Sequence, residues 1–276
     1  MTDKHTSELA AEITQLPVQP GAAMRLLWML EDPRTSAADL GRVIESDPAL
    51  STQVIRLANT AFYGLSGQVS SAWRAVTVLG LATVRALATT AAFDLFNTKG
   101  RAVPDDFWAH SVCTAAASSC AAARLGHQAN EAFSVGLLHD IGSALMFRRA
   151  PRRYELVLER LRSEPDVSIL ALEIAEFGIS HAQVAEAALA AMKFPAALTT
   201  AIASHHFQPH KVESPLGKVL ILGDAIAAEI EPTTETTGSI EEALLELGLQ
   251  ASAGESLIEQ VKCDQENLVG FLNVRT

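Results

Sequence analysis

The chain has 276 residues, of which 49% are hydrophobic and 19% are charged, so it can bury a full core and is not a disordered protein. Its 21 Lys and Arg residues stand against 32 Asp and Glu residues, and the net charge of −11 argues against nucleic-acid binding, which depends on neutralising phosphates. The three cysteines form no CxxC pair, which excludes a disulfide framework and favours a reduced, cytoplasmic compartment.

The N-terminal half is predicted to be helical from its spacing of apolar residues. The first residues, Met1 to Glu8, lack the apolar core of a signal peptide. Charges such as Arg74 and Arg85 interrupt the later apolar runs, so we expect no membrane span. The predicted helices cover residues 20–31, 36–46, 48–60, 71–78 and 81–96.

Capping signals mark several of these helix ends. Ser36 with Asp39 resembles a capping box, and Asp47 followed by Pro48 provides an N-cap and a first-turn proline. The stretch Asn59 to Gly64 is typical of a helix C-terminus closed by glycine. No alternating run of strand length occurs, so the fold class is all-α.

The chain divides into two predicted lobes and a C-terminal appendage. The N-terminal lobe spans residues 9–97, the second lobe spans 105–230, and the appendage spans 239–273. The second lobe begins with a helix rich in Ala and Ser from Phe107 to Leu125, which suits close packing in a bundle. From Glu229 onwards the chain has ten acidic and two basic residues, which usually serve solubility and less often dock a basic partner.

The stretch Gly136 to Gly142 places His139 and Asp140 side by side in an apolar, helix-forming segment. A buried Asp needs a cation or hydrogen-bond donors. Neighbouring residues lie about 100° apart on a helix, so the pair can face one cation only near a helix end. Imidazole and carboxylate groups bind Zn²⁺, Fe and Mn²⁺, and a bridging Asp could hold a second metal ion.

Other residues of the second lobe could join this pair in one polar cluster. His205 shares a helical stripe with Leu198 and Ile202, and Asp224 lies inside an apolar run. The alternative is that each histidine is an ordinary core or surface residue without a binding role. This is our interpretation of His5, His127 and His210. The residues themselves favour a shared cluster and leave open whether it binds a metal.

Two further features carry weaker signals. The basic stretch Phe147 to Tyr154 could receive an anion, although a solvated helix start is the favoured interpretation. Cys113 lies three residues from His110 on an Ala-rich helix, which is a poor arrangement for nucleophilic catalysis. No phosphate-binding glycine loop of the GxxxxGK[ST] or GxGxxG type is present.

The chain resembles the HDOD family, a bacterial group related to the HD and HD-GYP metal-dependent phosphohydrolases. The resemblance covers about Leu16 to Ala228 and rests on motifs in both lobes. These motifs are Leu16-Pro-Val, Ser46 to Leu50, Val54 to Gly64, Ala75 to Gly80, Phe107 to Ser111, Gly136 to Gly142, Phe177 to His181 and His205-His206. It implies an all-helical, two-lobed fold whose second lobe is HD-like.

The resemblance also implies a metal-ligand set in the second lobe, holding a divalent ion such as Fe, Mn or Zn. The matching residues are His110, His139, Asp140, His181, His205, His206 and Asp224. It assigns no catalytic residue and no organic cofactor.

Three departures from the hydrolase branch bear on activity. Ser143 stands where that branch has a lysine, so a charge that would bind phosphate is missing. Phe207-Gln-Pro follows the histidine pair in place of the glycine-tyrosine-proline loop, which disfavours cyclic di-GMP hydrolysis. The gap from Asp140 to His181 is longer than in the hydrolase branch, which indicates that the helices forming one wall of the site are rearranged.

We therefore expect a regulatory signalling module that acts through a protein partner, without nucleic acid or membrane, around a degenerate or structural metal site. The alternative is a metal-dependent HD-type phosphohydrolase or phosphodiesterase.

Overall fold

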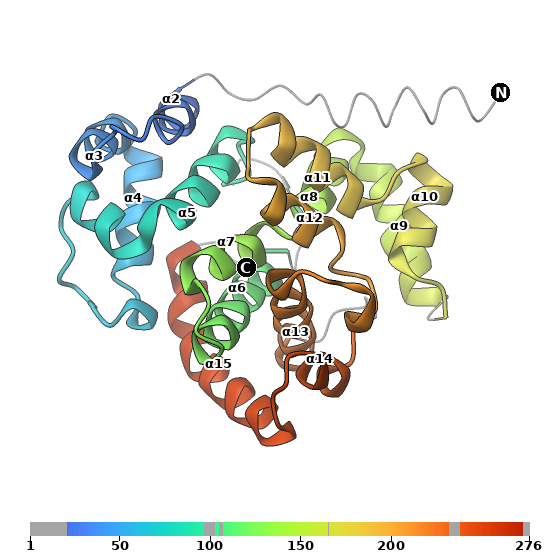
Figure 1. The fold of residues 1–276 in the computed structure, drawn as a ribbon. Helices are drawn as coiled ribbons and strands as arrows, with labels where there is room; N and C mark the ends of the chain where they lie inside the picture. The colour runs from blue at the N-terminus through green and yellow to red at the C-terminus, as the bar shows by residue number, and fades with distance from the viewer. Residues whose placement is uncertain (1–20, 97–102, 105–106, 165, 232–237, 273–276) are drawn as a thin grey trace.

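The computed structural model describes residues 21–96, 103–104, 107–164, 166–231 and 238–272, and within these ranges the chain forms helices and no strand (Figure 1). The α-helices are α2 (Ala22–Met29), α3 (Ala37–Glu45), α4 (Pro48–Ala58), α5 (Ala72–Ala92), α6 (Phe107–Arg124), α7 (Ala129–Leu138), α8 (Ile141–Arg149), α9 (Pro151–Ser163), α10 (Ile169–Phe177), α11 (His181–Ala191), α12 (Ala196–Ala203), α13 (Pro215–Ile230), α14 (Ile240–Glu246) and α15 (Ala251–Leu272). Two short 3₁₀ helices are η1 (Ala61–Tyr63) and η2 (Pro209–Lys211). The all-α prediction is confirmed.

The predicted capping signals start the helices that they precede. Ser36 and Asp39 form a reciprocal capping box at α3, and the Asp47 carboxylate accepts the N–H groups of Ala49 and Leu50 at α4. Ser180 forms a second capping box at α11 with Gln183. Each cap satisfies backbone donors that a helix start leaves open.

Gly80 interrupts α5 between the two predicted ranges, 71–78 and 81–96. Its φ of 77° and ψ of 161° lie outside the helical region, and glycine reaches a positive φ without steric strain. Two helical halves result, close to the predicted ranges 71–78 and 81–96.

The end of α4 differs from the prediction. The helix stops at Ala58, and Gly64, with φ 68°, closes the 3₁₀ helix η1 and not α4. The Asn59 amide explains the early stop, because it both accepts the Val69 N–H and donates to the Val69 carbonyl.

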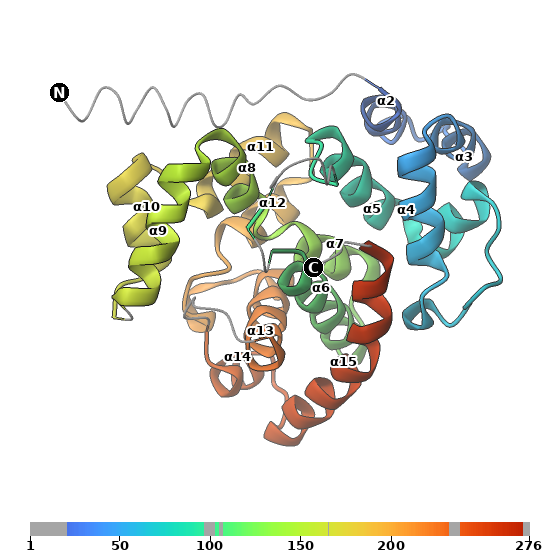
Figure 2. The same ribbon diagram turned by 180° about the vertical axis from the view of Figure 1, so that it is seen from behind.

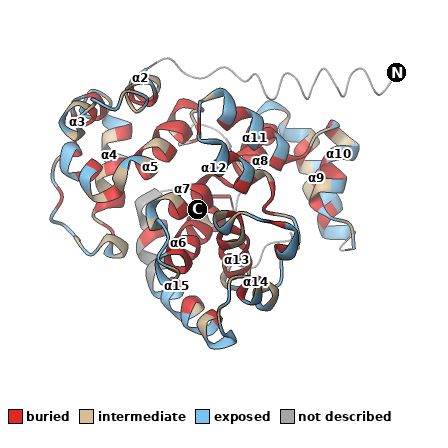
Figure 3. Cartoon of the chain, in the orientation of Figure 1, coloured by how far each residue is buried: buried red, intermediate tan, exposed pale blue. Residues whose placement is uncertain are grey.

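The helix α6 is the centre of the C-terminal part. It packs against α7, α13 and α15, and residues from Phe107 to Ala122 are buried along nearly its whole length. Figure 3 shows buried residues concentrated where these helices meet, and from behind α15 is seen alongside α6 (Figure 2). Leu257 and Val261 of α15 are buried in this contact region, so the last helix is part of the core.

The helices α2, α3 and α4 all pack against α5, and α5 in turn packs against α7. Among the described helices α5 is long and apolar enough to span a membrane, but 61% of its most apolar stretch is buried inside the protein. The division into lobes at 9–97, 105–230 and 239–273 stays a prediction, because residues 9, 97, 105 and 273 lie outside the described residues.

Candidate metal centre

The predicted ligands converge from helices that are distant in sequence. His110 lies on α6, Asp224 on α13, and His181 is the first residue of α11. His139 and Asp140 form the junction between α7 and α8, so the pair sits at a helix end as predicted. His205 and His206 follow the end of α12. His205 is buried as predicted, although it lies in the turn after the helix and not on a helical stripe.

Three glycines allow the ligand-bearing helices to approach one another. A Cβ atom at Gly136 would lie 2.6 Å from the Ala115 Cα of α6, and one at Gly142 would lie 1.9 Å from the His181 carbonyl oxygen of α11. A Cβ at Gly223, beside Asp224, would lie 2.1 Å from the Ser118 hydroxyl. The glycines of the Gly136–Gly142 motif therefore have a packing role, because only a hydrogen atom fits at these contacts.

One group of ligands, called here the first group, comprises His110, His139, Asp140 and Asp224. His110 Nε2 lies 2.9 Å from Asp224 Oδ1, and His139 Nε2 lies 3.2 Å from Asp140 Oδ2. The two imidazole Nε2 atoms are 3.3 Å apart. Candidate ligand atoms of His110, His139 and Asp140 all lie within 4.8 Å of one another, and Asp224 Oδ1 is 3.6 Å from His139 Nε2.

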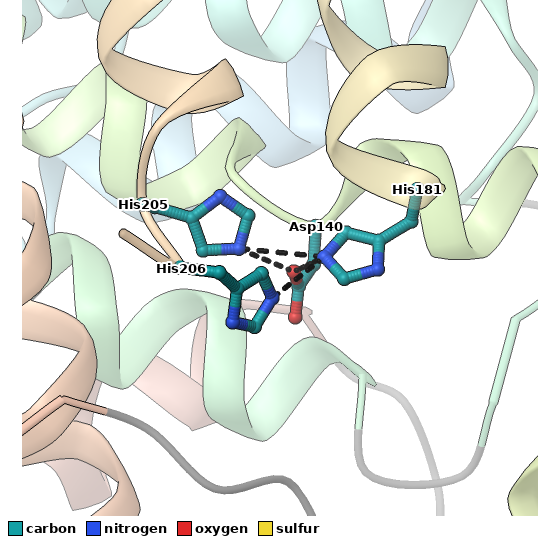
Figure 4. Close-up of side chains that lie close together, drawn as sticks. All are labelled: Asp140, His181, His205 and His206. Carbon is teal, nitrogen blue, oxygen red and sulfur yellow. Dashed lines mark hydrogen bonds and ion pairs between the residues drawn. The ribbon is translucent and has the colours of Figure 1, made fainter. Parts of the chain in front are cut away.

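The second group comprises Asp140, His181, His205 and His206 (Figure 4). The other oxygen of the same Asp140 carboxylate, Oδ1, lies 3.5 Å from both His181 Nε2 and His205 Nε2. His181 Nε2 is 3.4 Å from His205 Nε2 and 2.9 Å from His206 Nε2. Asp140 thus belongs to both groups, with one oxygen directed towards each.

Hydrogen bonds to the far side of each ring set the imidazole tautomers. Nδ1 of His139 lies 2.8 Å from the Gly136 carbonyl and Nδ1 of His205 lies 2.6 Å from the Ile202 carbonyl. A carbonyl only accepts, so these Nδ1 atoms carry a proton, and in the neutral ring the lone pair is then on Nε2. Nε2 atoms that face one another and a carboxylate need a shared proton or a cation between them, and a metal ion would satisfy all of them at once. The donor set therefore fits a bound metal ion.

The histidine rings stabilise the ionised form of both carboxylates. Burial alone would raise the pKa of Asp140, but the His139 and His205 rings outweigh it and hold that pKa well below its usual range. In Asp224 burial is likewise outweighed, chiefly by His110, and the pKa falls to about 2. Two buried carboxylates are thus ionised at neutral pH with histidine rings as their partners, and a metal ion bound among them would compensate the same charges.

The pKa shift of the histidine differs between the first group, with His139, and the second group, with His206. At His139 burial opposes the charged ring, but the Asp140 carboxylate prevails and raises the pKa. At His206 burial dominates, the His205 and His181 rings add to it, and the pKa is lowered well below its usual value. His206 is therefore a neutral ring at neutral pH, the form in which imidazole binds a metal.

The candidate ligands are buried to different extents. All candidate ligands are buried except His206, which is partly exposed. The next residue, Phe207, is exposed. Access from solvent is therefore on the side of His206.

Sequence reasoning missed Glu173, which supports His181. This residue of α10 is fully buried, and its Oε2 lies 2.8 Å from His181 Nδ1. A signal was present, because Glu173 falls on the helical stripe of the buried residues Ile169, Leu172 and Phe177. An acidic residue in such a stripe needs a partner.

The remaining candidates have no part in the cluster. His127 is exposed and His210 pairs with Glu242 at the surface, whereas His5 lies outside the described residues. Burial raises the pKa of the Cys113 thiol to about 12, which makes it a poor nucleophile. In the basic stretch Phe147 to Tyr154, Arg153 forms an ion pair with Glu176 of α10, which ties the two helices together.

Comparison with known proteins gives matches in sequence and in structure. A family model described as the HDOD domain matches residues 16–208. A relative from Treponema pallidum (strain Nichols), described as an uncharacterized protein, is 23% identical over 214 residues, which are 77% of this chain and 42% of the relative. The chain thus spans less than half the length of that relative.

Two solved structures share the fold. One, from Shewanella amazonensis SB2B and described as a candidate phosphohydrolase, has a TM-score of 0.74 and 23% identity, covering 96% of this chain and 97% of its own. The other, from Marinobacter aquaeolei VT8 and described as a candidate signal transduction protein, has a TM-score of 0.73 and 22% identity, covering 98% of this chain and 65% of its own. At these identities the likeness shows a common fold.

Proposed function

This chain belongs to the HDOD family, and on that premise we propose that it is a signal-transduction module that acts through a protein partner and carries a metal centre of structural or regulatory role. The observation that carries the proposal is the burial of every candidate ligand except His206. A catalytic metal site keeps an open coordination position for water and substrate, whereas a structural site is closed by protein ligands.

The ligand set supports a divalent ion such as Fe, Mn or Zn. Its members are His110, His139, Asp140, Asp224, His181, His205 and His206. A bound cation would neutralise the two carboxylates and satisfy the lone pairs of the imidazoles, and so it would hold the helices that carry them together. Nitrogen and oxygen donors in this ratio suit these metals better than Ca²⁺ or Mg²⁺.

The surroundings of Asp140 disfavour phosphate chemistry. Ser143, one turn into α8, is 4% exposed and is not a lysine. The groups that chiefly hold the pKa values of Asp140 and Asp224 down are histidines. Hydrolases of phosphate esters use cationic side chains to stabilise the charge of the transferring group, and this position lacks one.

The cytoplasmic location is part of the same proposal. No disulfide joins Cys113, Cys120 and Cys263 in the part of the chain that the structure describes, which suits a reducing compartment. The structural neighbour from Marinobacter aquaeolei is described as a candidate signal transduction protein, which supports the proposed class of function.

A second candidate function is metal-dependent phosphohydrolysis, which one observation favours. Asp140 directs one oxygen to each ligand group, an arrangement that suits a pair of neighbouring metal ions. The structural neighbour from Shewanella amazonensis is described as a candidate phosphohydrolase.

The deciding experiment supplies Fe²⁺, Mn²⁺ or Zn²⁺ to the purified protein and assays phosphomonoesters, nucleotides and cyclic dinucleotides. The proposal predicts bound metal without turnover of any of these. Metal-dependent turnover that Asp140→Ala abolishes, with the helical circular dichroism unchanged, would establish the hydrolase in its place.

A further inference from the structure

A buried carboxylate outside the set of candidate ligands contacts His181 on the side of the ring that faces away from the cluster. Glu173, on α10, has an exposure of 0%. Its Oε2 accepts the backbone N–H of His181 at 2.7 Å, and the His181 ring nitrogen Nδ1 lies 2.8 Å from Oε2 and 3.0 Å from Oε1. The Tyr154 hydroxyl donates to Oε1 at 2.7 Å. Glu173 thereby fixes both the backbone and the ring of one ligand.

These contacts determine which nitrogen of His181 faces the cluster. A carboxylate beside Nδ1 accepts the proton of that nitrogen, so the neutral ring has its lone pair on Nε2. That Nε2 lies 3.5 Å from Asp140 Oδ1 and 3.4 Å from His205 Nε2. If the ring carried its proton on Nε2 instead, an N–H group would occupy the place of a metal ion.

The negative charge of Glu173 calls for an explanation beyond packing. A glutamine could make the same number of hydrogen bonds with Tyr154 and His181 while avoiding the burial of a full charge, which is costly. A carboxylate behind an imidazole makes Nε2 a stronger donor to a metal, which a neutral amide does much less. The charge is therefore useful when a cation lies on the other side of the ring.

Tyr154 lies on α9 and Glu173 lies on α10. Both helices lie between the His139-Asp140 pair and His181 in the chain. The two helices are packed together and joined by the Arg153–Glu176 ion pair. The segment between Asp140 and His181, whose length departs from the hydrolase pattern, thus contains the residues that support His181.

We propose that Glu173 is a positioning residue of the metal centre, which holds His181 as the Nδ1-protonated tautomer and directs its Nε2 into the second group. Its consequence for metal binding rests on the proposed metal centre, whereas the tautomer is a property of the metal-free protein. The two parts can therefore be tested separately.

The tautomer is measured by ¹⁵N–¹H spectroscopy of the histidine-labelled, metal-free protein, with the His181 signals assigned by their loss in His181→Gln. We expect a proton on Nδ1 and none on Nε2 in the native protein. A proton on Nε2 would overturn the proposal, and this measurement needs no Glu173 variant to fold.

Metal binding is measured by titrating Co²⁺ into the metal-free protein and following its visible absorption. Glu173→Gln keeps the shape of the side chain and should weaken Co²⁺ binding about 10- to 100-fold, with a shifted absorption band and an unchanged circular dichroism spectrum. The matched control is Glu176→Gln on the same helix, which should leave both the affinity and the band unchanged.

The outcomes separate this proposal from the proposed function. Native protein that binds Co²⁺ and a Glu173→Gln variant that binds it equally well would refute the positioning role and leave the metal centre standing. Native protein that binds no Co²⁺ while showing the Nδ1 tautomer would refute the metal centre and confirm the positioning of His181.

Discussion

Replacing Gly142 with alanine should both destabilise the protein and weaken the metal centre. Gly142 lies in the first turn of α8, two residues after Asp140. An added Cβ would lie 1.9 Å from the carbonyl oxygen of His181, 2.7 Å from its carbonyl carbon and 3.0 Å from the Ala185 nitrogen. These are backbone atoms of α11, so no side-chain rotation can relieve the contact.

The size of the effect follows from that distance. An ordinary contact of about 3.4 Å requires α8 and α11 to separate by about 1.5 Å. Overpacking of this kind typically costs about 1–3 kcal/mol, against a gain of about 0.5–1 kcal/mol when alanine replaces glycine in a helix. Because Asp140 precedes α8 and His181 begins α11, the separation also widens the 3.5 Å contact between Asp140 Oδ1 and His181 Nε2.

Thermal unfolding by circular dichroism and metal content after dialysis measure the two effects. We expect a Tm lower by several degrees, at about 2–4 °C per kcal/mol for a chain of this size, together with a loss of metal from the second group. Gly21→Ala is the control, because nothing lies within 4 Å of its added Cβ and its φ of 173° is extended backbone. A Gly142→Ala protein that is more stable than native and retains its metal would show that helix propensity outweighs packing, and would refute the reasoning.

Three further predictions concern other parts of the structure. Ser143→Lys should lower the Tm and create no phosphatase activity, because a position that is 4% exposed cannot readily hold a charged, longer side chain; a stable variant that gains metal-dependent turnover would contradict this. Leu257→Ala in α15 should reduce the free energy of unfolding in urea by about 2–5 kcal/mol, since the side chain is fully buried, and a loss below about 1 kcal/mol would mean that the last helix contributes little to the core. Removal of metal from the native protein by a chelator should lower its Tm reversibly, because a ligand present at 100 times its Kd adds about 2.7 kcal/mol to stability; a Tm that chelation and metal addition leave unchanged would argue against a structural role.

Local signals in the sequence predicted the helix starts well. The capping box at Ser36 and the N-cap at Asp47 both depend on backbone geometry within a few residues. Such effects are independent of distant contacts, so the residue types at these positions suffice to predict them. The prediction that Gly64 closes α4 was wrong, because the helix ends at Ala58, where the Asn59 amide bonds the Val69 backbone. The spacing of residues in the sequence does not reveal this contact.

The candidate site was predictable as a set of residues and not as an arrangement. The 100° rotation between neighbours implied that His139 and Asp140 could face one cation only near a helix end, and the pair lies at such an end. The division of the ligands into two groups that share Asp140 depends on how α7, α8 and α11 pack, which the sequence pattern does not specify. Glu173 escaped notice because its partner His181 lies on another helix, although its place in an apolar stripe was a usable sign.

The metal content of protein purified without added metal tests the central claim most directly. Native protein and Asp140→Ala are compared by elemental analysis, since Asp140 is the ligand that both groups share. We predict near-stoichiometric Fe, Mn or Zn in the native protein and a loss of metal from the variant, with its helical content retained. A native protein that contains none of these metals and takes up none when they are supplied would contradict the account.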